Sequence, residues 1–409
     1  MLDFSGRAAV SARVAAALCT LCVFVGRATL DPFDPLGALG APAASVAAWL
    51  PSAVAASSAQ DCTLPPSNFA VFQGAPFHTD QMGFLIEYFR LCHHNFSIFA
   101  GAEHASSALP VFARYYGRLN IRPAEDFLSA HADFAAAFLI TPDERALPDA
   151  LRQAEAARFV YLTHLALNGF VKRWMVLRLY TTPLAGVPAT LPVFAAPAPV
   201  PADDRRKDVV FVGTIFDGQN VNVRDLVSLA SHLAGASFSF VLFTSQFTGG
   251  DADHAALRDA GVVVRLKAST EEVHEAVRSA AFVLLFPSAS SWYLTDRISG
   301  AHPMAVSLAT PILTTTRFAD IYGLSAATGA VAAGDAPSMA AAVAALAPRA
   351  YADLVAAAVA YRARHVRHNV RAIEDVLEYV PSLNRGAAGA RMPLSERVSG
   401  RIIPGEARR

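Results

Sequence analysis

Short apolar runs alternate with amphipathic stretches along the second half of the chain. Each run is long enough for a buried strand, and a polar turn or a helical pattern follows it. The runs are Asp208–Gly213, Phe238–Phe243, Gly261–Leu266, Ala281–Phe286 and Pro311–Thr315. After the first run, apolar residues recur at three- and four-residue spacing, namely at Val223, Leu226, Val227, Ala230 and Leu233. This alternation predicts an open, mostly parallel sheet covered by helices.

The later helices carry recognisable start signals. Ser269-Thr-Glu-Glu272 has the order of a capping box, in which the first and last side chains satisfy each other's backbone N–H groups. Apolar residues then follow on one helical face, from Val273 to Ala280. Long helical stretches continue from Pro337 to near Val380. These signals predict that the second half ends in helices packed on its sheet.

The first half repeats the pattern less cleanly. A strand is predicted at Asn68–Gly74, followed by a loop over Ala75–Asp80. A helix then presents Met82, Leu85, Phe89 and Cys92 on one face, with Asp80 as its candidate N-cap. Further strands are predicted at Phe96–Ala100, Phe134–Ile140, Phe159–Thr163 and Met175–Tyr180. The first half is therefore expected to form a second open sheet.

Proline marks the boundary between the two halves. Residues 188–204 are rich in Pro and Ala, and proline lacks the backbone donor that a sheet interior needs. We therefore predict an N-terminal domain over residues 67–187, a linker over 188–204 and a C-terminal domain over 205–383. The Arg- and Gly-rich tail, 384–409, is predicted to be disordered.

The amino terminus resembles a targeting segment. Arg7 and Arg13 precede an uncharged apolar run, Val14–Val25, and Arg27 follows it. The run is shorter than the roughly 20 residues of a full membrane span and fits a signal peptide or a short signal anchor over residues 1–28. A buried amphipathic helix is the alternative. Residues 29–66, rich in Ala, Pro and Ser, are predicted to be a stem. The expected location is a membrane of the secretory pathway with a single N-terminal anchor, or else secreted or cytoplasmic.

Charge and cysteine content narrow the possible partners. The chain has 34 basic and 34 acidic residues, so it has no broad positive field for nucleic acid. No Cys/His cluster has zinc spacing, and no metal site is predicted. Cys62 and Cys92 can pair if the domain is luminal, which the sequence leaves open. Asn95-Phe-Ser97 is a glycosylation sequon and a further hint of luminal exposure.

A candidate phosphate site follows the first strand of the second half. The strand ends at Gly213, and Thr214 opens a polar turn that contains Asn220 and leads into a helix. A glycine-containing turn before a helix directs backbone N–H groups toward one point, which suits a phosphate. Lys267 directly follows another strand and is a candidate partner for the same charge. A simple turn at Gly213 and Asn220 and a solvated Lys267 are the alternatives.

With these elements in place, the second half resembles the carboxy-terminal domain of GT-B-fold glycosyltransferases of the broad group 1, family 4-like kind. The similarity covers Asp208 to Gly334, and its most specific part is the loop, helix and strand from Asp296 to Pro311, with Ala305 placed as in the family. The first half resembles the acceptor domain more faintly, through Gly74–Asp80 and His164. The resemblance implies two Rossmann-like domains facing a cleft, which move a sugar from a nucleotide diphosphate sugar to the hydroxyl of a glycan, lipid or protein.

The resemblance also implies roles for individual residues in the second half. No cofactor is implied, because the nucleotide diphosphate sugar is itself the donor substrate. Arg297 is expected to neutralise the diphosphate, or else to be solvated beside Asp296. Ser299 and Gly300 are expected to offer backbone amides, or else merely to start a helix. His302 is expected to contact the sugar or the ribose, with a packing role as the alternative.

Acceptor chemistry is expected on the first half. An inverting transferase needs a general base for the acceptor hydroxyl, and either His78 or Asp80 on the loop after the first strand is suitable. His164 ends another strand on the same predicted sheet edge and is a third candidate. A lone histidine is more often structural, so each of these roles competes with that alternative.

One departure from the family pattern bears on activity. The family places two Glu residues eight positions apart, and this chain has Asp296 at the first position and Met304 at the second. Methionine accepts ribose hydrogen bonds poorly. A degenerate GT-B protein that binds a nucleotide or glycan is therefore one alternative, and a nucleotide-sugar epimerase of the same fold is another. A dinucleotide oxidoreductase is disfavoured, because neither first turn carries three glycines.

Overall fold

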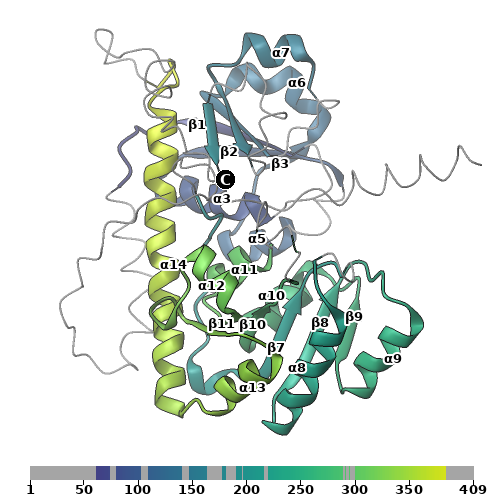
Figure 1. Ribbon diagram of the computed structural model, residues 1–409. Coiled ribbons are helices and arrows are strands. Elements are labelled where there is room, and N and C mark those ends of the chain that lie inside the picture. Colours follow the sequence, from purple (N-terminus) through teal and green to yellow (C-terminus); the bar gives the residue numbers. More distant parts are fainter. Residues whose placement is uncertain are drawn as a thin grey trace, which may run out of the picture.

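A computed structural model gives the architecture of the chain (Figure 1). It describes residues 61–73, 80–102, 109–140, 147–163, 177–180, 190–195, 197–215, 220–288, 291, 294 and 300–383. The predicted targeting segment, residues 1–28, and the tail, residues 384–409, lie outside this set. Two α/β domains lie one above the other, and one long helix runs beside both of them (Figure 1).

The first domain is built on a six-stranded parallel sheet. Its strands are β1 Asn68–Gln73, β2 Asn95–Ala100, β3 Ile121–Pro123, β4 Ala136–Ile140, β5 Phe159–Thr163 and β6 Leu177–Tyr180. Their spatial order is β3-β2-β1-β4-β5-β6, the order of the doubly wound dinucleotide-binding fold. The helices are α3 Asp80–Leu91, α5 Leu109–Tyr116, α6 Phe127–Ala130 and α7 Asp149–Ala154.

The second domain repeats the same plan. Its strands are β7 Arg206–Val212, β8 Ser239–Thr244, β9 Val263–Leu266, β10 Ala280–Leu285, β11 Ile312–Thr315 and β12 Ala330–Ala333. The order β12-β11-β10-β7-β8-β9 is again the doubly wound one, read from the other edge. The helices are α8 Val223–Gly235, α9 Asp251–Asp259, α10 Thr270–Ser279, α11 Ala301–Ser307, α12 Thr316–Tyr322, α13 Ala336–Ala344 and α14 Pro348–Leu377.

These two sheets confirm the predicted fold class of two Rossmann-like domains. The apolar stripe predicted from Val223 lies on α8, and Ser269 and Glu272 form the predicted capping box at the start of α10. The strands β3 and β12 were not predicted, because they are short and contain Pro or Ala instead of an apolar run. Strands buried on both faces explain why the predicted runs are almost continuously apolar.

Each domain has a core on both faces of its sheet. Along β1, Phe69 and Val71 belong to one apolar cluster, whereas Ala70 and Phe72 belong to another. Successive side chains of a strand point to opposite faces, so a strand with helices on both sides needs apolar residues at every position. A substitution by a charged residue at any of these four positions would place that charge in a core.

The described part of the linker, residues 190–195 and 197–204, packs against the neighbouring helices. Leu191, Val193 and Phe194 are almost fully buried. Side chains from three helices hold its backbone. The Phe194 N–H donates to Ser307 Oγ (3.1 Å), the Ala195 N–H to Glu87 Oε2 (3.0 Å), the Arg362 guanidinium to the Pro197 carbonyl (3.0 Å) and the Asn369 amide to the Leu191 carbonyl (2.7 Å). The boundary between the domains is therefore ordered through side chains of α3, α11 and α14.

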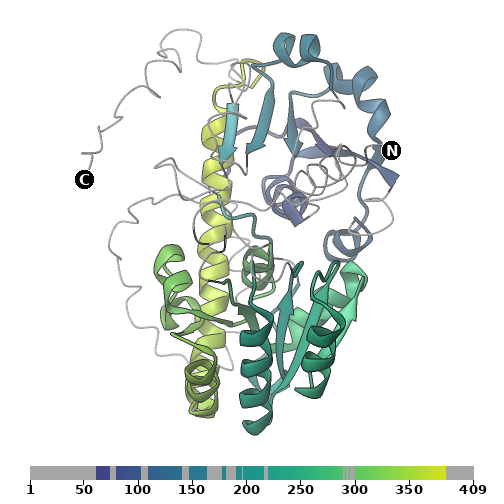
Figure 2. The same cartoon turned by 45° about the vertical axis from the view of Figure 1, so that its right-hand side comes forward.

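Helix α14 and the pair α5 and α10 connect the domains. Figures 1 and 2 both show α14 running along the full height of the molecule, past both sheets. Arg114 on α5 forms a bidentate ion pair with Glu271 in the first turn of α10, and Tyr115 Oη lies 3.3 Å from His274 Nδ1. Because α10 begins after the carboxyl end of β9, this contact turns the carboxyl edge of the second sheet toward the first domain.

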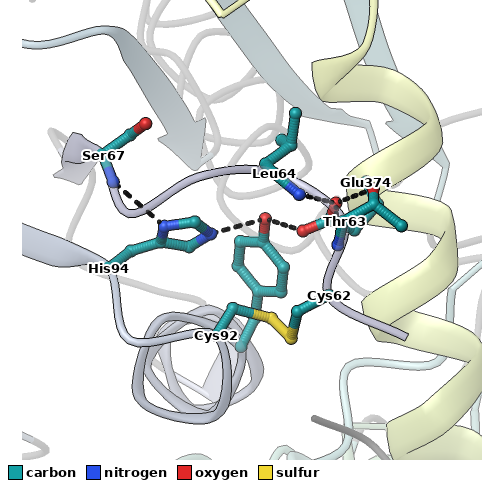
Figure 3. The surroundings of a disulfide bond; sticks show 8 residues. Cys62, Thr63, Leu64, Ser67, Cys92, His94 and Glu374 are labelled. Atoms are coloured by element: carbon teal, nitrogen blue, oxygen red, sulfur yellow. Dashed lines mark hydrogen bonds between the residues drawn. A yellow bond between two sulfur atoms is a disulfide. The ribbon is translucent and has the colours of Figure 1, made fainter. Parts of the chain in front are cut away.

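The described chain begins inside the stretch predicted as a stem. Cys62 and Cys92 form a disulfide, which resolves the pairing that the sequence left open (Figure 3). Next to it, Glu374 on α14 accepts hydrogen bonds from the Thr63 N–H (2.9 Å), the Thr63 hydroxyl (2.5 Å) and the Leu64 N–H (2.9 Å). Residues 61–64 are thus fastened both to α3, through the disulfide, and to α14.

Figure 3 also shows a hydrogen-bonded chain that continues from Glu374 to His94. The Tyr88 hydroxyl donates to Glu374 Oε1 (2.7 Å), and His94 Nε2 lies 3.1 Å from the same hydroxyl. The Ser67 N–H donates to His94 Nδ1 (3.2 Å), so the ring hydrogen is on Nε2 and points to Tyr88. Burial lowers the pKa of His94 to about 4, which keeps the ring neutral and this direction fixed.

No single helix in the described ranges is both long and apolar enough to cross a bilayer. Only α13 and α14 taken together reach that length and composition, and they meet at an angle of 108°.

Candidate functional site

A pocket lies at the carboxyl ends of β7 and β10, the two central strands of the second sheet. In a doubly wound sheet the crossover direction reverses between these two strands, and ligands bind in the crevice outside their carboxyl ends. The pocket is lined by Phe211, Val212, Gly213, Thr214, Val221, Leu284, Leu285, Phe286, Pro287 and Phe318. Two of the predicted residues, Gly213 and Thr214, therefore lie at the place where this fold binds ligands.

Gly213 turns the chain out of the sheet. Its φ of +154° lies in a region that residues with a Cβ rarely adopt, and its N–H donates to the Phe243 carbonyl of β8 (3.0 Å). The next residue, Thr214, places its hydroxyl 3.2 Å from the Ser245 hydroxyl at the exposed end of β8. The pocket thus has an apolar floor and a small polar rim.

Asn220 joins the two loops that border this pocket. It is only 1% exposed, its side-chain amide donates to the Thr214 carbonyl (2.6 Å), and its own carbonyl accepts from the Ser288 N–H (3.0 Å). Thr214 follows β7, and Ser288 follows β10. Asn220, which was predicted to contact a donor, therefore joins the two loops through its side-chain amide on one side and its backbone carbonyl on the other.

Lys267 lies on the same edge of the sheet but away from the pocket lining. It is exposed, its backbone is left-handed (φ +53°), and its N–H donates to the Thr244 carbonyl (3.0 Å). It follows β9, the edge strand, and β8 separates β9 from β7. Its charge is therefore at the rim of the carboxyl edge.

His302 lies in the core of the second domain. It is 2% exposed, and its ring packs edge-on against Phe318 (6.1 Å between centroids) and Tyr322 (5.5 Å) of α12. Within the described residues neither ring nitrogen has a hydrogen-bond partner. Burial lowers the pKa of His302 to about 3, so the ring is neutral at ordinary pH. Phe318 also lines the pocket, so His302 supports one pocket wall from behind.

Gly300, another predicted residue, directly precedes α11 as its N-cap.

This burial predicts a loss of stability in acid. The pKa of His302 is about 3 in the folded protein and 6.5 as a reference, so between these values the unfolded chain binds the additional proton. Stability is fully present above pH 6.5 and falls as the pH drops toward 3. His302→Phe keeps the aromatic packing without a titrating group. Between pH 6.5 and 5, we expect wild type to lose about 2 kcal/mol more than this variant, measured by urea unfolding. Parallel pH profiles would contradict the assignment.

Five predicted residues lie outside the described ranges, namely His78, His164, Asp296, Arg297 and Ser299. Asp80 is the first residue of α3, so the predicted helix start is correct within one residue. Met304, at the second family position, packs against the apolar core on α11. The described residues therefore bring together Gly213, Thr214 and Asn220 at the pocket, with His302 behind it and Lys267 at a distance.

Several pocket residues were not predicted as site residues. Phe211 and Phe286 were placed within predicted strands, and Pro287 and Phe318 were not singled out. An aromatic residue near the carboxyl end of a strand is a signal that could have identified Phe211 and Phe286. That signal is weak, because the same residues are common in cores.

Among the described residues, one group has the spacing of metal ligands, namely Cys92, His94 and Glu374. Cys92 is in the disulfide, and His94 and Glu374 are both committed to the hydrogen-bonded chain beside it. A disulfide sulfur is not a thiolate and does not coordinate a metal as one. This group therefore functions as a structural cluster.

Similarity to known proteins is found only among solved structures. No protein-family model matches the sequence, and no curated protein matches it. Among solved structures, AviGT4, a glycosyltransferase involved in avilamycin A biosynthesis, has 15% identity and a TM-score of 0.47, covering 77% of this chain and 98% of its own. Anabaena Alr3699/HepE in complex with UDP and glucose has 9% identity and a TM-score of 0.46, covering 76% and 99%.

The S. aureus MnaA–UDP structure has 10% identity and a TM-score of 0.42, covering 71% of this chain and 91% of its own. Since all of these TM-scores are below 0.5, the fold assignment rests on the strand order of the two sheets.

Proposed function

We propose that this protein is a glycosyltransferase that moves a sugar from a nucleotide diphosphate sugar to an acceptor hydroxyl of a glycan, lipid or protein. The observation that carries the proposal is the pocket at the carboxyl ends of β7 and β10, which Gly213 lines on the sheet edge turned toward the first domain. A donor bound there would present its sugar toward a second doubly wound sheet, the place for an acceptor. The resemblance over Asp208–Gly334 supports the same assignment.

The proposed chemistry needs a fixed positive charge beside the leaving group. The acceptor oxygen attacks the anomeric carbon, the bond from that carbon to the diphosphate oxygen breaks, and a base takes the hydroxyl proton. Arg297 is the proposed partner of the departing diphosphate, with backbone N–H groups of Ser299 and Gly300 beside it. Lys267 adds positive charge at the rim. No cofactor or metal is part of this proposal.

The base is proposed to come from the first domain. His78 and Asp80 follow β1, and His164 follows β5, so all three follow carboxyl ends of strands in one sheet. Parallel strands bring their carboxyl ends to the same edge. In an inverting reaction one of these groups would accept the hydroxyl proton. Asp296 would contact the donor from the second domain.

A protein that binds without turnover is the second candidate, and Met304 is the observation that favours it. In the family pattern this position holds a carboxylate for the ribose, whereas here a thioether packs against the core. A nucleotide-sugar epimerase of the same fold is a third candidate, and it would release a product altered at one sugar carbon. Release of nucleoside diphosphate with sugar transfer distinguishes the first candidate from both of these.

We further propose that the catalytic domains lie in the lumen of the secretory pathway, held by an N-terminal anchor in residues 1–28. The Cys62–Cys92 disulfide supports this location, because disulfides persist in oxidising compartments and are rare in the cytosol. The arginine-flanked apolar run Val14–Val25 is independent support from the sequence.

Ligand-induced stabilisation tests the donor site. Purified protein is heated with a panel of nucleoside diphosphates and nucleotide sugars, with a chelator present. We expect one base to raise the melting temperature, and Arg297→Ala to weaken its apparent affinity by about 10-fold or more, since a charge-assisted hydrogen bond is lost. Arg258→Ala, an exposed arginine on α9, is the matched control and should behave as wild type. Folded protein that no nucleotide stabilises would overturn the proposed function.

A further inference from the structure

The sequence holds a single N-linked glycosylation sequon, Asn95-Phe96-Ser97, and the structure places its asparagine at the surface. Asn95 is the first residue of β2 and is exposed, whereas the four residues from Ser97 to Ala100 are buried. Its backbone N–H donates to the Ser67 carbonyl (2.9 Å), and this hydrogen bond holds the backbone that carries the side chain in place. A glycan on this residue would extend into solvent without displacing the core.

The position of Asn95 also keeps a glycan away from the proposed site. All strands of the first sheet are parallel, and Asn95 pairs in register with Asn68, the first residue of β1. Both residues therefore lie at the amino edge of the sheet. The proposed acceptor groups follow the carboxyl ends of β1 and β5, at the opposite edge. A large hydrophilic group at Asn95 is compatible with access of an acceptor.

A second and independent observation lies three residues before Asn95. Cys92, which directly follows α3, is bonded to Cys62 (Figure 3). Disulfides of this kind form in compartments that also hold the machinery for N-linked glycosylation. The disulfide and the exposed sequon are thus two separate observations that both indicate the lumen of the secretory pathway.

We infer that Asn95 carries an N-linked oligosaccharide in the mature protein. In this step the Asn95 amide nitrogen attacks the anomeric carbon of a lipid-diphosphate-linked oligosaccharide. A carbon–nitrogen bond forms, the bond between that carbon and the diphosphate oxygen breaks, the lipid diphosphate departs, and the amide gives up one proton. The modification is distinct from the proposed activity, because the chain is here the acceptor for another enzyme.

The burial of Ser97 determines whether the glycan is added before or after folding. Its side chain is 6% exposed, and its hydroxyl accepts a hydrogen bond from the Asn120 amide (2.7 Å) next to β3. The sequon hydroxyl must be accessible while the amide is modified, so the glycan is added before β2 and β3 pair. Modification accompanies synthesis and translocation, and the folded protein is not a substrate.

The full chain translated with microsomes from the endoplasmic reticulum tests this inference. We expect one slower-migrating form, removed by an enzyme that cleaves N-glycans, and protected from added protease by the membrane. Asn95→Gln should abolish the slower form. Ser97→Thr, which preserves the sequon, should retain it, and Asn68→Gln, the register partner outside any sequon, should behave as wild type.

Mass spectrometry of the Asn95 peptide, together with alkylation of free thiols, gives the decisive comparison. A glycan at Asn95 on chains whose Cys62 and Cys92 resist alkylation supports the inference. Chains with the disulfide but an unmodified Asn95 overturn it, and so do chains with free thiols that remain outside the microsomes. Adding microsomes only after translation and folding should give no modified form, and efficient modification at that stage would contradict the order of events.

Discussion

Replacing Glu374 with alanine is expected to destabilise the protein by about 3–5 kcal/mol, because four donors, one buried and three part-buried, lose their acceptor and each unsatisfied buried donor costs about 1–3 kcal/mol. The donors are the Thr63 N–H and hydroxyl, the Leu64 N–H and the Tyr88 hydroxyl. Glu374 is 4% exposed, so water does not readily replace it. Denaturant unfolding followed by circular dichroism measures the loss.

A neighbouring carboxylate provides the control. Asp375 is exposed on the same turn of α14, and Asp375→Ala should change the stability by less than about 0.5 kcal/mol, as surface substitutions usually do. If the two variants lose stability equally, the effect belongs to the helix and not to the buried cluster. Reducing the Cys62–Cys92 disulfide should add to the loss, because the disulfide and Glu374 fasten the same segment.

Gly329→Ala is expected to destabilise by about 2–5 kcal/mol, since left-handed strain of about 1–2 kcal/mol adds to an overpacking cost of about 1–3 kcal/mol. Its φ is +77°, and a Cβ there would lie 2.6 Å from the Ala358 Cβ and 2.8 Å from its backbone. The turn before β12 thus packs directly on α14. Thermal or denaturant unfolding of the purified variant measures the change.

Gly323 is a matched control for this prediction. It is also left-handed, with φ +61°, but a Cβ there would meet nothing within 4 Å. Gly323→Ala should therefore cost only the strain, about 1–2 kcal/mol. Equal losses at the two glycines would show that the backbone conformation alone matters and that the contact with α14 contributes nothing.

The elements that the sequence predicted well are those set by local interactions. The apolar stripe of α8 and the capping box of Ser269 and Glu272 depend on residues within one or two turns, and both are present. The order of strands and helices follows from the same local patterns, and the doubly wound order follows from the rules for parallel sheets. The short strand β12, composed of Ala and Val, gave no comparable signal.

The roles of individual polar residues were less predictable, because their partners come from distant segments. Asn220 was predicted as a donor contact, and the structure adds that its side-chain amide bonds Thr214 while its backbone carbonyl accepts from Ser288, which follows another strand. His302 is buried by Phe318 of α12. Helical periodicity likewise predicts the apolar face of α14, but it does not reveal that this face also contacts the first domain.

The central claim is that the protein transfers sugar from a nucleotide diphosphate sugar, and product analysis tests it most directly. Purified chain is incubated with labelled nucleotide sugars, a mixed acceptor panel and a chelator, and the nucleotide and sugar products are identified by mass spectrometry. We expect nucleoside diphosphate in equal amount to a new glycoside, and at least about 10-fold less of both from Arg297→Ala at low donor concentration. Nucleotide sugar recovered unchanged by folded protein, or recovered with only one sugar carbon inverted, would contradict the account.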